Sequence, residues 1–145
     1  MKAPRSGPRL RPAPRARREA AGWRREKGGA ARRAGRGAEW VAAAWLMLKG
    51  WRILGFRLKV GGAEIDILAV RGRVLAVVEV KRRATMEAAL LALTPAQYGR
   101  LVAAGRAVLR GRPSLEGHVL RIDMVALAPG RLPRHLAAVG PAGKG

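Results

Sequence analysis

The 145-residue chain contains no cysteine, so it can hold neither a disulfide framework nor a thiolate-ligated metal. It has two histidines and nine acidic residues, and no apolar run approaches the roughly 20 residues of a membrane-spanning helix. The N-terminus also lacks the apolar core of a secretory signal. These absences predict a cytoplasmic, single-domain protein that does not insert into a membrane.

Positive charge is what the chain has in excess. Thirty lysines and arginines give a formal net charge of +21 at pH 7, and residues 1–37 carry 13 basic and 2 acidic side chains. The remaining 108 residues carry 17 basic and 7 acidic side chains, so they are cationic as well. A field of this sign attracts polyanions, which favours nucleic acid as the partner and an anionic membrane surface as the second option.

Residues 1–36 are dominated by proline, arginine, alanine and glycine. Such a segment cannot bury enough apolar surface to offset its ordering entropy, so we predict a basic disordered tail. The tail is either a solvated segment that aids solubility or a non-specific phosphate-binding arm. We favour the arm, and we expect no sequence specificity from it.

Apolar periodicity and turn residues divide the rest of the chain into helices and strands. Helices are predicted at 38–49 and from Thr94 onward. Strands are predicted at 51–60, 63–71, 74–83 and 118–127, and the strand at 118–127 is expected to be the last one in the chain. Thr94 and Gln97 have the spacing of a capping box. The order predicts an α/β domain at 37–128, with α+β as the alternative, in which helices flank a small mixed sheet. Residues 129–145 are expected to form a weakly ordered C-terminal tail.

The helix at 38–49 is apolar on nearly all sides, so we expect it to be buried against the sheet with Trp40 and Trp45 in the core. Three arginines are candidates for contact with nucleic acid phosphates. They are Arg82 and Arg83 at the end of the strand at 74–83, and Arg100 on the second helix.

The strands at 63–71 and 74–83 are almost wholly aliphatic apart from a few charged side chains. Gly72 and Arg73 between them suit a two-residue hairpin turn, which places Arg71 opposite Val74. In that register Asp66 faces Glu79, and Glu64 faces Lys81. Like charges directly opposite each other destabilise a sheet, so a divalent cation is the expected reason for the two facing carboxylates.

Mg²⁺ or Mn²⁺ is the expected ion, and Asp66 and Glu79 are its predicted ligands. Lys81 would place a positive charge beside the attacking water or the transition state, and Glu64 would orient it or add a ligand. Glu39 is either a further carboxylate near the ion or an acid that stabilises the start of its helix. The alternative for Glu79 and Lys81 is a plain ion pair on a solvated face.

Four short segments occur in the order of the motifs of the YraN family, which the chain resembles over residues 35–128. They are residues 35–39 (GRGAE), 62–68 (GAEIDIL), 77–82 (VVEVKR) and 121–125 (RIDMV). The resemblance implies a restriction-endonuclease-like fold of the PD-(D/E)-x-K superfamily. It also implies Asp66 and Glu79 as metal ligands. Lys81 would be the catalytic lysine and Glu39 the helix-borne acid, whereas Gln97 stands where the family commonly has lysine, so we assign it only the capping box.

The expected function is therefore that of a metal-dependent endonuclease that hydrolyses DNA phosphodiester bonds at branched or damaged structures, with DNA favoured over RNA. The alternative is a non-catalytic nucleic-acid-binding accessory protein of a repair, recombination or uptake complex. Related nucleases often act as dimers, so a homodimer is a further option. Asp123 and Arg121 are expected to form a structural ion pair, and the isolated His118 and His135 are given no role.

Overall fold

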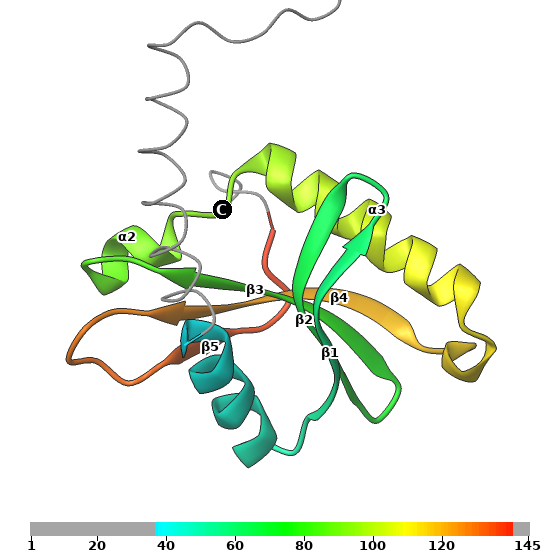
Figure 1. Ribbon diagram of the computed structural model, residues 1–145, viewed down its shortest axis with the longest axis horizontal. Coiled ribbons are helices and arrows are strands. Elements are labelled where there is room, and N and C mark those ends of the chain that lie inside the picture. The colour runs from blue at the N-terminus through cyan, green and yellow to red at the C-terminus, as the bar shows by residue number, and fades with distance from the viewer. Residues whose placement is uncertain (1–36, 141–145) are drawn as a thin grey trace, which may run out of the picture. The chain divides into compact units, whose positions relative to one another are not determined.

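Five strands form one mixed sheet in the order β1-β2-β3-β4-β5 (Figure 1). The computed structural model describes residues 37–140, so the predicted basic tail at 1–36 lies outside the described residues. The strands are β1 Arg52–Val60, β2 Ala63–Arg71, β3 Val74–Arg82, β4 Val119–Leu127 and β5 Arg134–Leu136. β3 and β4 are parallel, and every other neighbouring pair is antiparallel.

Within residues 37–140, three α-helices flank the sheet, and a short 3-10 helix η1 precedes β4. They are the helix of residues 37–48, α2 Met86–Leu90 and α3 Pro95–Gly111, and η1 is Pro113–Leu115. α2 and α3 form the crossover that a parallel pair such as β3 and β4 requires. The predicted α/β class is confirmed, and the fold is consistent with a restriction-endonuclease-like core. None of the described helices is long and apolar enough to span a membrane.

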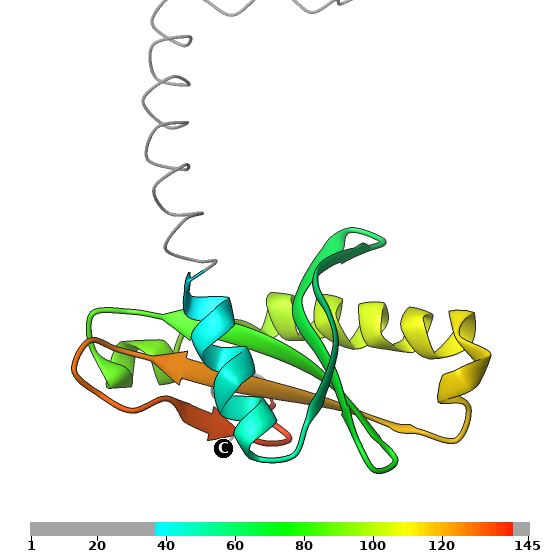
Figure 2. The same cartoon turned by 60° about the horizontal axis from the view of Figure 1, so that its bottom comes forward.

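Helices cover both faces of the sheet, which explains why its central strands are aliphatic on both sides. Leu101 and Val108 of α3 pack on one face, against residues such as Val77. On the other face, Ala42 and Leu46 of the helix of residues 37–48 belong to a second apolar cluster. Figure 2 shows this helix crossing the sheet on the side away from α3.

Gly105 allows α3 to lie close to the sheet. A Cβ atom at this buried position would lie 2.5 Å from Cδ1 of Leu120 and 3.1 Å from Cγ2 of Val77. The absence of a side chain therefore sets the distance between the helix and strands β3 and β4.

The predicted hairpin between β2 and β3 is confirmed over half of its length. Arg71 pairs with Val74 and Ile67 with Val78, and Gly72 has the positive φ of 61° that its turn position requires. The paired residues end at Ile67, so the predicted backbone pairs of Asp66 with Glu79 and of Glu64 with Lys81 were wrong. Glu64 keeps its partner Lys59 on the β1 side, but the β1–β2 hairpin bends away from β3 beyond Ile67 (Figure 2).

The helix of residues 37–48 has one buried and one exposed face, although it is apolar on both. Ala42, Ala43 and Leu46 are fully buried, whereas Trp40 is 64% exposed. Trp40 packs beside Phe56 of β1 with 5.0 Å between the ring centroids. Its expected place in the core was therefore wrong, since small alanines, not the tryptophan, face the sheet.

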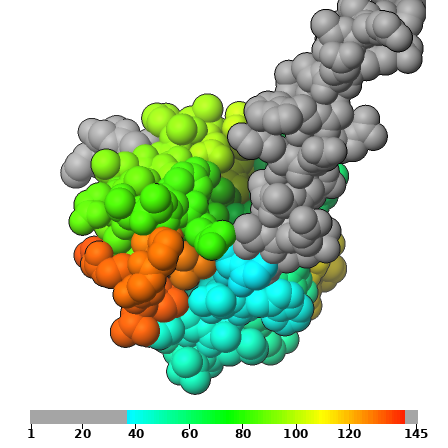
Figure 3. Space-filling view, turned by 60° about the vertical axis from the view of Figure 1, so that its left-hand side comes forward, coloured from blue at the N-terminus to red at the C-terminus, as the bar shows by residue number. Residues whose placement is uncertain are grey.

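The crossover between β3 and α3 contains the short helix α2. Thr85 caps α2, because its Oγ accepts a hydrogen bond from the Ala88 N–H at 3.1 Å. The buried Met86 and Ala89 pack with Ala126 and Ala128. Figure 3 shows the green surface that includes α2 directly above the orange segment that follows β4, with the cyan helix of residues 37–48 to the right of the orange segment.

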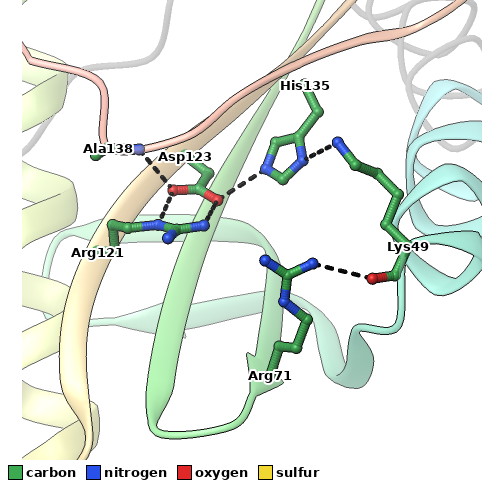
Figure 4. Close-up of polar contacts among 6 residues, drawn as sticks. All are labelled: Lys49, Arg71, Arg121, Asp123, His135 and Ala138. Atoms are coloured by element: carbon green, nitrogen blue, oxygen red, sulfur yellow. Dashed lines mark hydrogen bonds and ion pairs between the residues drawn. The ribbon is translucent and has the colours of Figure 1, made fainter.

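The segment after β4 differs from the expected weakly ordered tail, because it adds β5 to the edge of the sheet. Asp123 of β4 is fully buried and forms the predicted ion pair with Arg121, through two contacts of 2.9 Å (Figure 4). His135 of β5 also contacts this carboxylate, at 2.8 Å, and the Ala138 N–H donates to it at 3.0 Å. A buried carboxylate with several donors thus anchors the segment after β4.

His135 was given no role from sequence, but it joins two parts of the fold. The ammonium of Lys49 lies 2.9 Å from its Nδ1 (Figure 4). An ammonium only donates, so Nδ1 is the acceptor and Nε2–H donates to Asp123. The end of the first helix is connected in this way to β4 and β5.

Candidate active site

The candidate site lies where β2 leaves β3. Oδ2 of Asp66 accepts a hydrogen bond of 2.9 Å from the backbone N–H of Val80. The side chain of Asp66 thus takes the place of a backbone partner just beyond the last paired residues, Ile67 and Val78. This exchange fixes the carboxylate beside β3 and keeps the backbone donor of Val80 satisfied.

Glu79 is close enough to Asp66 to affect the ionisation of the Asp66 carboxyl group. Burial and the charge of Glu79 raise the pKa of Asp66 to about 7, against the opposing effect of the hydrogen bond from Val80. The charge of Glu39 adds to the rise. Three acidic side chains therefore share one region, and the site favours a bound cation or a proton at neutral pH.

Lys81 lies on the same side of β3 as Glu79 and is held by two partners. Its ammonium is 3.1 Å from Oε2 of Glu79 and 3.2 Å from Oε1 of Gln97. The side chains of Lys81 and Glu79 are 8% and 11% exposed. This degree of burial does not fit the alternative of an ion pair on a solvated face.

Gln97 is one site residue that sequence reasoning missed. It completes the predicted capping box of α3, because its N–H donates to Thr94 Oγ and its Oε1 accepts from the Thr94 N–H. The same Oε1 contacts Lys81. The available signal was its place in the YraN-like pattern, where a lysine is common, but the capping box alone accounted for a glutamine there.

Glu39 reaches the site from the helix of residues 37–48. Its Oε1 accepts a hydrogen bond of 2.7 Å from Nε of Arg57 in β1. The hydrogen bond to Glu39 raises the pKa of Arg57 despite partial burial, and the charges of Glu39, Glu64 and Asp66 contribute. Arg57 was not among the predicted site residues.

An open pocket of about 290 Å³ connects several of these side chains. Its lining includes Glu64, Asp66 and Glu79 from the hairpin strands, and Gln97 and Arg100 from α3. Arg100, a predicted phosphate contact, thus lies beside the carboxylates. The two other predicted contacts, Arg82 and Arg83, are exposed at the end of β3 and do not line this pocket.

The carboxylates of the site suit Mg²⁺ or Mn²⁺, which keep water or phosphate oxygens as ligands, better than a metal ion whose ligands all come from protein. Among residues 37–140, no group of three or more acidic or histidine side chains forms a metal cage. Mg²⁺ is usually held by one or two carboxylates with water and phosphate oxygens, which matches Asp66 and Glu79 beside an open pocket. Burial and the neighbouring charge of Glu79 both raise the pKa of Asp66, and a bound cation would favour the ionised carboxylate against both effects.

The mixed sheet between helices defines an α/β protein, and its fold is consistent with a restriction-endonuclease-like core. The chain belongs to the uncharacterised protein family UPF0102, the YraN family, whose profile matches residues 38–127. A UPF0102 protein of Caulobacter vibrioides is 56% identical over 117 residues, which cover 81% of this chain and 94% of that protein. Another, from Paramagnetospirillum magneticum, is 49% identical over 111 residues, 74% of this chain and 86% of that protein.

Proposed function

We propose that this protein is a Mg²⁺- or Mn²⁺-dependent endonuclease that hydrolyses phosphodiester bonds of DNA, with branched or damaged DNA as its substrate. The observation that carries the proposal is the pair of carboxylates Asp66 and Glu79 that lines one open pocket, with the buried ammonium of Lys81 3.1 Å from Oε2 of Glu79. Two crowded carboxylates and a fixed ammonium are costly to bury, and such perturbed groups cluster at functional sites.

Asp66 and Glu79 would hold the ion. When bound, it supplies a polarised phosphoryl oxygen and a water of lowered pKa. Asp66 is prepared for this role by the Val80 N–H, which fixes one of its oxygens. Glu79 faces the pocket and Lys81 together, so its carboxylate would connect the ion to the ammonium.

Lys81 would act on the reacting phosphate or on the attacking water. Its ammonium has three donors, of which Glu79 and Gln97 take two. The remaining donor is available to an oxygen in the site. Positive charge fixed in place before the reaction stabilises the charge that develops on phosphate in the transition state.

The experiment is a cleavage assay on single-stranded, duplex and four-way-junction DNA, with Mg²⁺, Mn²⁺ or EDTA. We expect cleavage that requires the metal and is lost in Asp66→Asn and Lys81→Met, while both variants still bind DNA. Arg131→Gln serves as a control, because it removes an exposed positive charge from a residue that does not line the pocket. Equal cleavage by wild type and Asp66→Asn would contradict the proposal and indicate a contaminating nuclease.

A second candidate is a non-catalytic DNA-binding protein of a repair, recombination or uptake complex. It is favoured by the net charge of +21 and by the two structural partners of Lys81, Glu79 and Gln97, which occupy two of its three donors. Binding that resists EDTA, falls steeply with salt and never leads to cleavage would support this candidate over the nuclease.

A further inference from the structure

The pocket of the candidate site continues into a second hollow. This hollow has a volume of about 150 Å³ and shares Gly62, Ala63 and Arg100 with the lining of the first pocket. Its walls are the turn between β1 and β2 on one side and α3 on the other (Figure 1). The two hollows therefore form one continuous groove between the β1–β2 hairpin and α3, which we call the hairpin groove.

The two ends of the hairpin groove differ in polarity. Asp66 and Glu79 line the first end, which is the candidate metal site. The second end is lined mainly by aliphatic residues and glycines, such as Val60 and Ala107, and among the described residues only Arg100 brings a charge to it. Apolar walls with a few placed polar groups are typical of a site for a small organic group. The groove therefore suits a ligand with oxygen atoms for a metal at one end and an apolar body at the other.

Arg100 lies where the two ends meet, because it lines both of them. It is exposed on α3, and within residues 37–140 its side chain forms no hydrogen bond or ion pair. Lys81, in contrast, has two partners at the first end. The fork of N–H donors of a guanidinium matches two oxygen atoms of a phosphate. Arg100 can therefore bind a phosphate at the junction without breaking an existing contact.

Close packing of the hairpin on α3 is the structural explanation for small residues in these walls. Packing of that kind is present at Gly105, where a Cβ atom would meet Leu120 and Val77. At Gly62, in contrast, no atom outside the neighbouring residues lies within 4 Å of the place of a Cβ, and Ala103 of the opposite wall is exposed. The small residues of the groove thus leave a space that the described chain does not fill.

The size of the second end limits what it can hold. Its volume of about 150 Å³ is below the roughly 300 Å³ at which pockets for drug-sized ligands begin, so it has room for one base at most. A base inside a duplex is stacked and paired, and it must leave the stack before it can enter a pocket. Leaving the stack costs least for a base that is mismatched, damaged or already single-stranded. The groove therefore favours an unpaired nucleotide over an intact duplex.

We propose that the second end of the hairpin groove holds the base of an unpaired nucleotide, while Arg100 binds a phosphate of the same strand beside the candidate metal site. The inference rests on the proposed function for DNA as the ligand. It narrows the substrate to DNA with unpaired nucleotides next to the cleaved bond, such as a single-stranded flap. An unpaired strand would use both ends of the groove, whereas an intact duplex would contact Arg100 alone and bind more weakly.

The test measures the affinity of the full chain, in EDTA, for a labelled duplex with a single-stranded flap and for a fully paired duplex. Wild type should bind the flap DNA more tightly. Ala103→Leu should weaken flap binding by about 10-fold, because leucine fills the space for the base, and should leave duplex binding unchanged. Ala107→Leu, one turn further along α3, lines the same end and should have the same effect. Leucine is nearly as good a helix former as alanine, so both variants should fold.

Ala44→Leu is the matched control, because Ala44 is an exposed alanine of the helix of residues 37–48 and does not line the groove. Its affinity for both DNAs should equal that of wild type. Equal flap binding by wild type, Ala103→Leu and Ala107→Leu would overturn the proposal. An equal loss of affinity for the flap and the paired duplex would overturn it as well, since the groove would then not respond to unpaired bases.

Arg100→Gln tests the phosphate contact. It should weaken binding of the flap DNA by about 10-fold and reduce the slope of log affinity against log salt by about one phosphate contact. Arg110→Gln removes the same charge from an exposed position about 15 Å further along α3 and should have a smaller effect. An unchanged salt slope in Arg100→Gln would overturn the role of Arg100.

Failure of this inference is distinguishable from failure of the proposed function. If wild type cleaves flap DNA with Mn²⁺ and the Ala103 and Arg100 variants bind and cleave it normally, the inference fails and the nuclease stands. If wild type never cleaves but these variants lose affinity for flap DNA in EDTA, the groove stands as a binding site and the nuclease fails.

Discussion

The amide oxygen of Gln97 lies 3.2 Å from the ammonium of Lys81 and 3.3 Å from the backbone nitrogen of Thr94. One atom thus serves both the start of α3 and the candidate site. The capping box fixes the glutamine, and the glutamine fixes the lysine. Lys81 is therefore positioned by a helix that follows it by more than a dozen residues in the chain.

This shared atom predicts different effects for two variants at the same helix start. Gln97→Ala should reduce DNA cleavage by about 10-fold, because Lys81 loses one of its two partners. Thr94→Ala removes the cap and should lower the free energy of unfolding by about 1 kcal/mol. It leaves the Lys81 contact available, so cleavage should be unchanged. Single-turnover cleavage and urea unfolding of both variants separate the two roles. A cleavage rate of Gln97→Ala equal to that of wild type would show that Gln97 serves α3 alone.

The raised pKa of Asp66 predicts a pH dependence of stability in EDTA. Its pKa is about 7 in the folded chain against an ordinary value of 3.8. Between these values the folded protein binds a proton that the unfolded chain does not, so stability falls as pH rises from about 4 to about 7. Asp66→Asn keeps an acceptor for the Val80 N–H and should raise the free energy of unfolding above pH 7 by on the order of 2 kcal/mol.

Urea unfolding of wild type and Asp66→Asn across this range in EDTA is the measurement. Parallel curves for the two proteins would mean that Asp66 titrates normally. Glu116→Gln is the control, because Glu116 is an exposed acid remote from the site and should not change the curve.

The features that were predictable from sequence are local ones. The hairpin turn at Gly72, the alternation along β2 and β3, and the capping box at Thr94 each depend on neighbours in the chain. They were enough to bring Asp66 and Glu79 to one site, although as backbone partners the two do not pair.

The features that were not predictable depend on distant segments. Nothing near Asp66 indicates that β2 leaves β3 there, since the chain remains aliphatic on both sides. The exposed position of Trp40 depends on which side of an all-apolar helix meets the sheet. β5 has three residues, too few for a periodic pattern, and is held by the contact of His135 with Asp123.

Asp123 supplies a prediction about acid stability. Burial would raise its pKa, but hydrogen bonds from His135, Arg121 and the Ala138 N–H outweigh that effect and lower it to about 2. The contribution of ionised Asp123 to the free energy of unfolding is therefore present at neutral pH and is lost as pH falls from about 4 to about 2. Asp123→Ala leaves buried donors unpaired and should cost about 3 kcal/mol or more at pH 7. Urea unfolding tests this, and a cost below that of an exposed acid such as Glu116 would contradict it.

Two glycines of α3 predict opposite effects of the same substitution. Gly99 has open space where a Cβ would lie, so Gly99→Ala should stabilise the protein by about 0.8 kcal/mol through helix propensity. At Gly105 the same atom would meet Leu120 and Val77, so Gly105→Ala should be destabilising by about 1 kcal/mol. Thermal unfolding of the variants Gly99→Ala and Gly105→Ala measures the two effects on stability. Equal shifts in Tm for the two variants would show that α3 does not depend on close packing at Gly105.

The most direct test of the central claim is Mn²⁺ binding by isothermal titration calorimetry, for wild type and Asp66→Asn. The claim is that Asp66 and Glu79 form a divalent cation site beside Lys81. It predicts one Mn²⁺ site per wild-type chain, release of a proton on binding near neutral pH, and loss of the site in Asp66→Asn. Equal Mn²⁺ binding by the two proteins, or no binding by wild type, would contradict the account.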